Sequence, residues 1–171
     1  SRLRMMFGQP LSKRWGLDRG LPAHRYYINL FLNEFSADIR GVCLEFDDRG
    51  YMDRFGGDTL ERFDVLHLDE SNPRATVVAD ITQPNDIPDH TYDCIICTHV
   101  LHVIPDVNAA VEGMHRILRP GGVLLCAVPH VSMYDEREGE MWRFTRLGLH
   151  TLMARSFGAE NVMAKGYGNS L

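Results

Sequence analysis

The sequence lacks several features that would each define a class of protein. No apolar run approaches the roughly 18 residues that a transmembrane helix needs, so we expect no membrane partner. The first residues contain no long apolar segment of the signal-peptide kind. Basic residues are not in excess: 18 Lys and Arg against 23 Asp and Glu give a net charge of −5, which argues against a nucleic-acid partner.

Cysteine is scarce, with four residues in 171. Cys94 and Cys97 form a C-x-x-C motif, but the surrounding run, YDCIICT, is typical of a buried strand. Side chains three apart on a strand point to opposite faces, so these two thiols do not share a metal ion. We therefore predict four buried, reduced thiols, no metal site and a cytoplasmic location.

The length and the 44% hydrophobic content are those of a single globular domain. We divide the chain into residues 1–40, an N-terminal extension with one helix, and residues 41–171, the main domain. The helix is predicted for 24–35, where apolar residues at 27, 28, 31, 32 and 35 lie on one helical face.

Apolar runs that alternate with helical patterns predict the rest of the fold. Helices are expected at about 106–118, which Pro120-Gly121-Gly122 would end, at 145–157 and, in short form, near 59–62. Strands are expected at 41–46, 64–69, 75–80, 92–98 and 123–128, with a sixth at 161–167. The fold class is α/β: a doubly wound, mostly parallel sheet with helices on both faces, without the last strand of such folds.

Three successive predicted strands end in an acidic residue, namely Glu45, Asp69 and Asp80. Ligands of open parallel sheets bind beyond the carboxyl ends of the strands. The three carboxylates would lie along that edge, which favours a binding site over acids that only solvate strand ends.

The order of segments resembles the class I S-adenosylmethionine (SAM)-dependent methyltransferases of the type 11 branch, over residues 41 to about 168. The matching segments are HRILRPGGVLL at 115–125, YDCIICTHVLHVI at 92–104 and VADI at 78–81. Shorter segments resemble methyltransferase-like domains near sugar-polymer systems: WGLDRGLP at 15–22, RYY at 25–27, FGG at 55–57, WRFT at 142–145 and GYGN at 166–169.

The resemblance implies SAM as the cofactor and assigns its contacts. Asp69, or Glu70 beside it, would bind the ribose diol, because a carboxylate accepts two hydrogen bonds. Asp80 would bind the adenine amine and Ile81 the adenine ring. The remaining cofactor residues would be Glu45 at the amino-acid tail, with Thr98 and His99 below the cofactor.

The loop after the first predicted strand departs from the family pattern. The family carries E-x-G-x-G-x-G there, whereas this chain carries EFDDRGY at 45–51. Glycine lets backbone approach a ligand closely, and Asp47 and Arg49 place side chains in that space. Asp47 and Asp48 are candidates to attract the sulfonium or amino group of SAM. The alternative is that cofactor binding is reshaped or lost.

Three histidines, His99, His102 and His130, follow the fourth and fifth predicted strands and are candidate catalytic bases. Packing in the turns is the alternative role for each. Trp142 and Arg143 are candidates for a substrate wall or for helix packing.

We predict a methyltransferase that acts on a small-molecule or saccharide acceptor, at oxygen. The alternative is a non-catalytic methyltransferase-like domain for binding or assembly. An NAD enzyme is disfavoured because no G-x-G-x-x-G follows the first strand. The sequence leaves the oligomeric state open.

Overall fold

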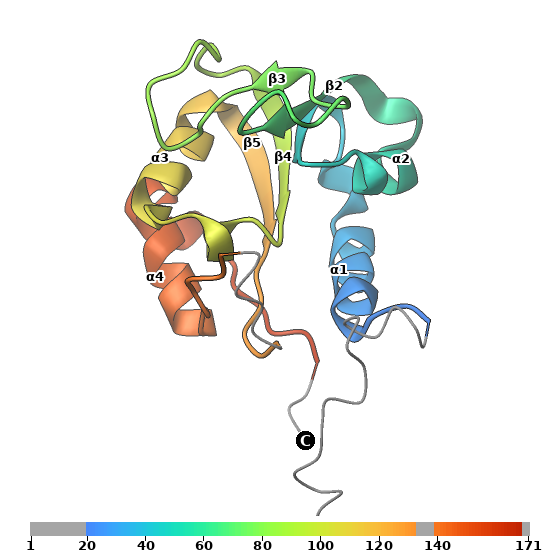
Figure 1. Ribbon diagram of the computed structural model, residues 1–171. Coiled ribbons are helices and arrows are strands. Elements are labelled where there is room, and N and C mark those ends of the chain that lie inside the picture. Colours follow the sequence, from blue (N-terminus) through green and yellow to red (C-terminus); the bar gives the residue numbers. More distant parts are fainter. Residues whose placement is uncertain (1–19, 133–138, 169–171) are drawn as a thin grey trace, which may run out of the picture.

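Five strands form a single parallel sheet in the order β3-β2-β1-β4-β5 (Figure 1). The structure is a computed structural model and describes residues 20–132 and 139–168. The strands are β1 (Gly41–Phe46), β2 (Leu60–His67), β3 (Val77–Val78), β4 (Tyr92–Thr98) and β5 (Leu118–Ala127). The predicted parallel sheet is confirmed.

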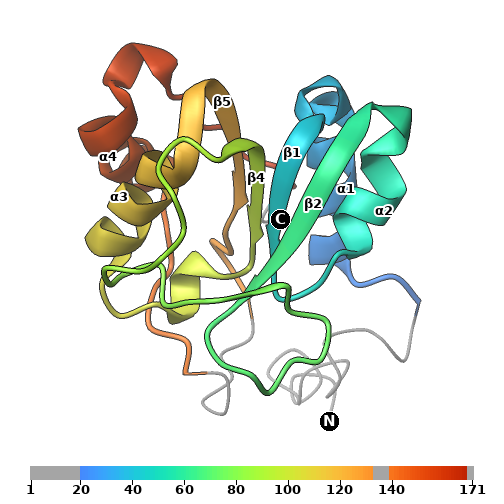
Figure 2. The same ribbon diagram turned by 90° about the horizontal axis from the view of Figure 1, so that it is seen from above.

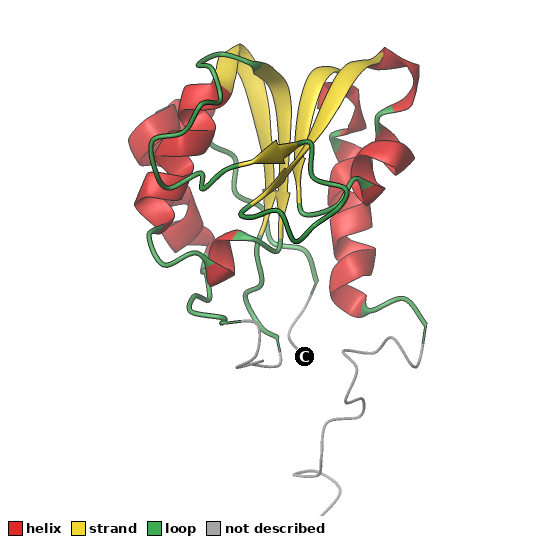
Figure 3. Ribbon diagram, turned by 45° about the horizontal axis from the view of Figure 1, so that its top comes forward, coloured by secondary structure: helices red, strands yellow, loops and turns green. Residues whose placement is uncertain are grey.

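Helices cover both faces of the sheet, as the prediction required (Figures 2 and 3). One face carries α1 (Ala23–Glu34) and α2 (Gly50–Phe55), and the other carries α3 (Val107–Ile117) and α4 (Arg146–Phe157). Single 3-10 turns lie at Ser36–Asp38 (η3), Gly57–Thr59 (η4), Leu101–Val103 (η5) and Ala159–Asn161 (η7).

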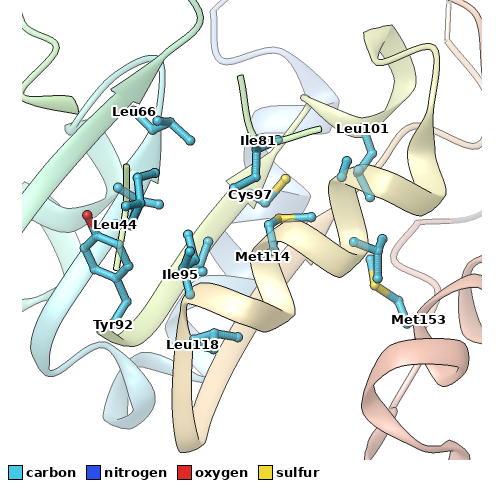
Figure 4. Packing of buried hydrophobic residues seen from close by; sticks show 14 of the residues in the cluster. Leu44, Leu66, Ile81, Tyr92, Ile95, Cys97, Leu101, Met114, Leu118 and Met153 are labelled. Atoms are coloured by element: carbon cyan, nitrogen blue, oxygen red, sulfur yellow. The ribbon is translucent and has the colours of Figure 1, made fainter. Parts of the chain in front are cut away.

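The core consists of two layers because side chains alternate along each strand. Cys94 and Ile96 of β4 pack in the layer beneath α1 and α2, whereas Ile95 and Cys97 pack beneath α3 and α4 (Figure 4). The C-x-x-C thiols therefore face opposite sides, as predicted. Cys94 is the register partner of Cys43, and Cys97 that of Cys126. All four thiols are free, and Cys126 is half-buried rather than buried.

Side-chain caps fix the start of the two later helices. Asp106 accepts a hydrogen bond from the Ala109 amide at the start of α3, as predicted. Thr145 accepts one from the Gly148 amide at the start of α4. Each cap therefore fixes the residue at which its helix begins.

Several predicted boundaries were wrong. The short helix predicted near 59–62 lies instead at Gly50–Phe55. The predicted range contains the start of β2, which begins at Leu60. Pro120 and Gly121 lie inside β5, which begins at Leu118 directly after α3, and β4 and β5 shift register there.

The sixth strand is also absent from residues 161–167, which follow η7 in an irregular path. This segment is held against α1 by Glu34. Lys165 Nζ lies 2.7 Å from the Glu34 carboxylate, and the Tyr167 hydroxyl donates a hydrogen bond to the same carboxylate at 2.6 Å. The sequence pattern gave no sign of these contacts, which replace strand pairing.

Gly113 of α3 lets this helix approach the backbone that follows β3. A Cβ added to Gly113 would lie 2.1 Å from the carbonyl oxygen of Ile81. Replacing Gly113 with Ala gains about 1 kcal/mol of helix propensity but forces this contact apart. We expect a net destabilisation of about 2 kcal/mol in urea unfolding. Gly50→Ala, whose Cβ would lie 3.8 Å from the nearest such atom, is the matched control. Equal effects in both variants would contradict this packing.

Candidate functional site

The carboxyl ends of β1 and β4 meet where the order of the strands reverses, which is where ligands bind in open α/β sheets. Left-handed backbone marks both ends: Asp47 after β1 has a φ of 68° and His99 after β4 has a φ of 54°. Non-glycine residues rarely adopt this conformation, and those that do are common at functional sites. This edge of the sheet is therefore the candidate functional site.

Glu45 lies at the bottom of this edge, and its residue is 2% exposed. Its carboxylate accepts hydrogen bonds from the amides of Tyr51 at 3.2 Å and Met52 at 2.9 Å, in the first turns of α2. Burial raises the pKa of Glu45 to about 7, against the lowering effect of the two amides. Glu45 thus lies one residue before the end of β1 and holds the start of α2.

A cavity of about 250 Å³ opens above Glu45, between α1 and α2. Its polar lining pairs opposite charges: the guanidinium groups of Arg25 and Arg54 and the carboxylates of Glu45 and Asp48. Asn29 adds an amide. Such a lining suits a zwitterionic group, with guanidinium for a carboxylate and carboxylates for an ammonium. Sequence reasoning assigned no binding role to Arg25, although it lies in the RYY segment, and it did not single out Arg54.

Asp69 and Glu70 follow β2 and are exposed. Asp69 Oδ1 accepts a hydrogen bond from the Ser71 amide at 2.9 Å, and its hydrogen bonds to Ser71 lower the Asp69 pKa. His67 reaches towards the same carboxylate, with Nδ1 3.3 Å from Asp69 Oδ1. Asp69 is thus an ionised acceptor at the site edge.

Asp80 follows β3, and its Oδ1 accepts hydrogen bonds from the amide of Thr82 at 2.8 Å and the hydroxyl of Thr82 at 2.7 Å. Asp80 also lines a groove of about 850 Å³ that runs beside β3. Ile81 points into the core beneath α3 and is 5% exposed, which leaves little of its side chain for a ligand (Figure 4).

Thr98 ends β4, and His99 follows it with its ring 4.9 Å from that of His24 on α1. Burial is the main cause that lowers the His99 pKa to about 4, and the nearby His24 and His102 add to it. His99 is therefore neutral at physiological pH. The sequence did not predict His24 here, since the helix pattern does not show which side meets β4.

His102, in η5, forms a buried pair with Glu140. Its Nε2 lies 3.5 Å from Glu140 Oε1, and the two side chains are 4% and 7% exposed. Arg143 holds the other oxygen of Glu140 at 2.6 Å. His102 Nδ1 is buried and has no hydrogen-bond partner within the described residues, which is uncommon for a buried polar atom and calls for an explanation. Burial lowers the His102 pKa, and the Glu140 charge opposes this.

Residues 140–144, which we term the strap, lie across the ends of β4 and β5. The amides of Met141 and Trp142 both donate to the carbonyl of His102, at 2.8 and 3.1 Å. The Trp142 indole donates to the carbonyl of Ile104 at 2.8 Å. The strap therefore covers His102 while leaving Trp142 40% exposed.

The structure brings only part of the predicted site together. The rings of His99 and His102 lie 5.6 Å apart, but His130 is exposed and contacts the carbonyl of Phe144. Arg143 holds Glu140 rather than forming an open wall. The predicted motif at 15–19, the acidic residues at 135–138 and Asn169 lie outside the described residues.

Neither a metal centre nor a membrane helix is found within residues 20–132 and 139–168. No cluster of three or more His, Cys, Asp or Glu side chains there has the arrangement that a metal ion needs. None of the helices there is both long and apolar enough to cross a bilayer.

The strand order, the covered sheet and the acids at its carboxyl edge define a Rossmann-like domain of the class I methyltransferase type. A family model described as "methyltransferase domain" matches residues 24–160. The chain therefore belongs to this family, whose members are class I SAM-dependent methyltransferases.

Solved structures with low sequence identity share the fold. The [4+2]-cyclase SpnF has a TM-score of 0.60 and 15% identity, with 79% of this chain and 57% of that chain covered. A candidate methyltransferase from Bacillus halodurans has a TM-score of 0.57 and 12% identity, with 76% and 68% covered.

The chain is also similar to parts of three polyketide synthases. Highly reducing polyketide synthase PKS6 of Gibberella zeae is 27% identical over 95 residues, or 52% of this chain and 4% of that protein. Reducing polyketide synthase Preu2 of Preussia isomera is 40% identical over 37 residues, or 22% and 2%. The chain thus spans only a few per cent of these relatives.

Proposed function

We propose that this chain binds SAM and transfers its methyl group to a small-molecule acceptor, with a hydroxyl group, such as one of a saccharide, as the first candidate. Family membership supports methyl transfer. The observation that carries the proposal is the buried His102–Glu140 pair with its unpartnered Nδ1 atom.

The residues at the site edge fit SAM. The cavity between α1 and α2 would take the zwitterionic tail, with Arg25 and Arg54 for the carboxylate and Glu45 for the ammonium. Asp69 would hold the ribose diol, and Asp80 the adenine amine. When bound, SAM supplies a methyl group made electrophilic by the sulfonium. Asp47 accommodates the left-handed turn that glycine adopts most easily, so the missing glycine leaves the turn intact.

His102 would act as the general base. Its Nε2 lies 3.5 Å from Glu140 Oε1, and a proton held on Nε2 beside this carboxylate would leave the lone pair on Nδ1 to take a proton from the acceptor. Glu140 fixes that tautomer and stabilises the imidazolium that forms, and Arg143 fixes Glu140. The strap excludes water from the base, so acceptor entry requires the strap to shift.

Calorimetry with SAM and S-adenosylhomocysteine (SAH) tests cofactor binding directly. We expect Asp80→Ala to weaken SAM binding at least about tenfold, because a charge-assisted hydrogen bond to the adenine amine is lost. Asp58→Ala, at an exposed position in η4, is the matched control and should leave binding unchanged. Unchanged affinity in Asp80→Ala would remove Asp80 from the site.

The absence of SAM and SAH binding to the wild-type chain would overturn the proposed function. That result would favour the alternative, a methyltransferase-like domain that serves binding or assembly. The polar cavity above Glu45 argues for the enzyme, because a domain that had lost its ligand has no need of a zwitterion-binding lining.

Carbon is a second candidate acceptor atom, favoured by the curated relatives, which are all named as polyketide synthases. A carbon between two carbonyl groups is acidic enough for an imidazole base to activate. A panel with methyl glycosides and acetoacetyl-N-acetylcysteamine separates the two candidates. Mass spectrometry of the product identifies the methylated atom.

A further inference from the structure

The strap turns a carboxylate inward and two large apolar side chains outward. The Glu140 side chain is 7% exposed and lies against His102 and Arg143. Met141 and Trp142, the next two residues, are 56% and 40% exposed. Water alone favours the reverse arrangement, because it solvates a carboxylate well and an apolar side chain poorly. The inward carboxylate is explained by His102, and the outward apolar side chains require an explanation of their own.

The outward side chains are not what fastens the strap. The amides of Met141 and Trp142 fasten it, through their hydrogen bonds to the carbonyl of His102. The Trp142 indole has a single N–H donor, and the carbonyl of Ile104 accepts it at 2.8 Å. The exposed part of this indole is therefore apolar, as is the Met141 side chain apart from its weakly polar sulfur.

We term Met141 and Trp142 the apolar platform. It lies directly beside the proposed base, because the backbone of both residues is bonded to the carbonyl of His102. A molecule whose reacting atom lies at the His102 side chain therefore has the platform within reach of its neighbouring groups. Exposed apolar surface next to a buried polar group is typical of ligand sites.

The platform fits one small apolar group better than it fits a protein. A stable protein interface buries roughly 800 Å² on each partner, which is far more than two side chains offer. Val131 adds one exposed side chain nearby, since His130 before it contacts the carbonyl of Phe144 at the end of the strap. A rigid indole face beside a flexible thioether suits an alkyl, acyl or aryl group.

We propose that Met141 and Trp142 bind an apolar group of the methyl acceptor, so that the acceptor is an amphiphile. Its reacting atom lies at His102 and its alkyl, acyl or aryl part lies on the platform. This inference rests on the proposed function, because it takes His102 as the base. A saccharide acceptor would then carry an apolar substituent, and a carbon acceptor would carry an extended acyl chain.

Fluorescence of Trp142 tests the platform without the cofactor. The sequence contains two tryptophans, so Trp15→Phe leaves Trp142 as the only one. Octyl glucoside, below its micelle concentration, should shift the Trp142 emission to shorter wavelength because it displaces water from the indole. It should bind at least about tenfold more tightly than methyl glucoside, which has the same sugar and a shorter chain.

Met141→Ala, in the same Trp15→Phe background, should weaken the binding of octyl glucoside at least about threefold. This substitution removes an exposed side chain and keeps the amide that fastens the strap. Met163→Ala, at an exposed methionine after η7, is the matched control and should bind octyl glucoside as the background does.

Turnover gives a second measurement. The active acceptor of the panel is compared with an analogue that carries a longer alkyl or acyl chain. The longer analogue should have a kcat/KM at least about tenfold higher, and Met141→Ala should reduce this advantage by raising the KM of the longer analogue.

The outcomes separate this proposal from the one beneath it. The absence of SAM and SAH binding overturns the proposed function, whereas the fluorescence measurement needs neither molecule. Equal affinity for the two glucosides, an unshifted emission, or unchanged octyl glucoside binding in Met141→Ala would overturn the platform alone. If Trp15→Phe is misfolded by circular dichroism, the same shift is measured in wild type and should be absent from Trp142→Phe.

Discussion

Replacing His102 with Gln should lower the rate of methyl transfer by about 10²- to 10⁴-fold, the usual contribution of a general base. Glutamine keeps a similar volume in the buried site beside Glu140 but cannot accept the proton. SAM affinity should stay within about twofold of wild type, because the proposed role of His102 is at the acceptor and His102 does not line the cavity proposed for the SAM tail. Single-turnover rates with the active acceptor from the panel give the measurement. His115→Gln, on the exposed side of α3, is the control.

The pH profile separates Glu140, as a positioning residue, from a merely structural role. Burial lowers the His102 pKa and the Glu140 charge opposes this, so Glu140→Gln removes the opposing charge. As the proposed base, His102 acts only when it is neutral. The rate of methyl transfer should therefore fall at low pH, where His102 becomes protonated. Glu140→Gln should move that acid limb to lower pH as well as reduce the rate. An unmoved limb would contradict the pairing.

The second large effect concerns stability. The contribution of Glu45 to the free energy of unfolding should be about 2.5 kcal/mol lower at pH 8 than at pH 5. A variant without this charge should lack that difference. The folded-state pKa of about 7 exceeds the unfolded value of 4.5, so folding favours the protonated form. This contribution is fully present below the unfolded value and is lost as the pH rises through the folded value.

Glu45→Gln isolates this effect, because Gln retains an oxygen that accepts the α2 amides but carries no charge. Urea unfolding at the two pH values should give a smaller pH dependence in the variant than in wild type. Glu61→Gln, an exposed residue of β2, controls for general charge effects. Identical pH dependence in wild type and Glu45→Gln would show that Glu45 titrates normally.

The sequence predicted the parts of the fold that depend on local patterns. β1 and β4 match their predicted ranges because both are continuous apolar runs buried on two faces. The start of α3 matches because Asp106 is a cap with a local partner. The prediction of a strand at 161–167 was wrong because this segment is held by contacts to Glu34. Glu34 is more than a hundred residues away in the sequence, so a local pattern does not show these contacts.

The site was predicted from residues at strand ends, and residues that reach the site from other elements were therefore missed. The carboxyl ends of parallel strands lie at one edge of the sheet, so the common position of Glu45, Asp69 and Asp80 could be predicted from strand direction alone. Arg25 and Glu140 come from a helix face and from the strap, whose placement depends on tertiary packing. The left-handed turn at Asp47 after β1 was not predicted, because the sequence E-F-D-D has no glycine to indicate it.

The segment held by Glu34 joins the carboxyl-terminal part of the described chain to α1, which carries part of the proposed cofactor site. Lys165 and Tyr167 anchor the last turn of α1, the helix whose first turns carry His24 and Arg25. If a ligand at Arg25 orders α1, the same helix carries this order to the anchor at Glu34, and thermodynamic reciprocity then requires the anchor to affect the ligand equally. Truncation of the chain before Lys165 should therefore lower the affinity for SAM, although the removed segment contains none of the residues proposed to bind it.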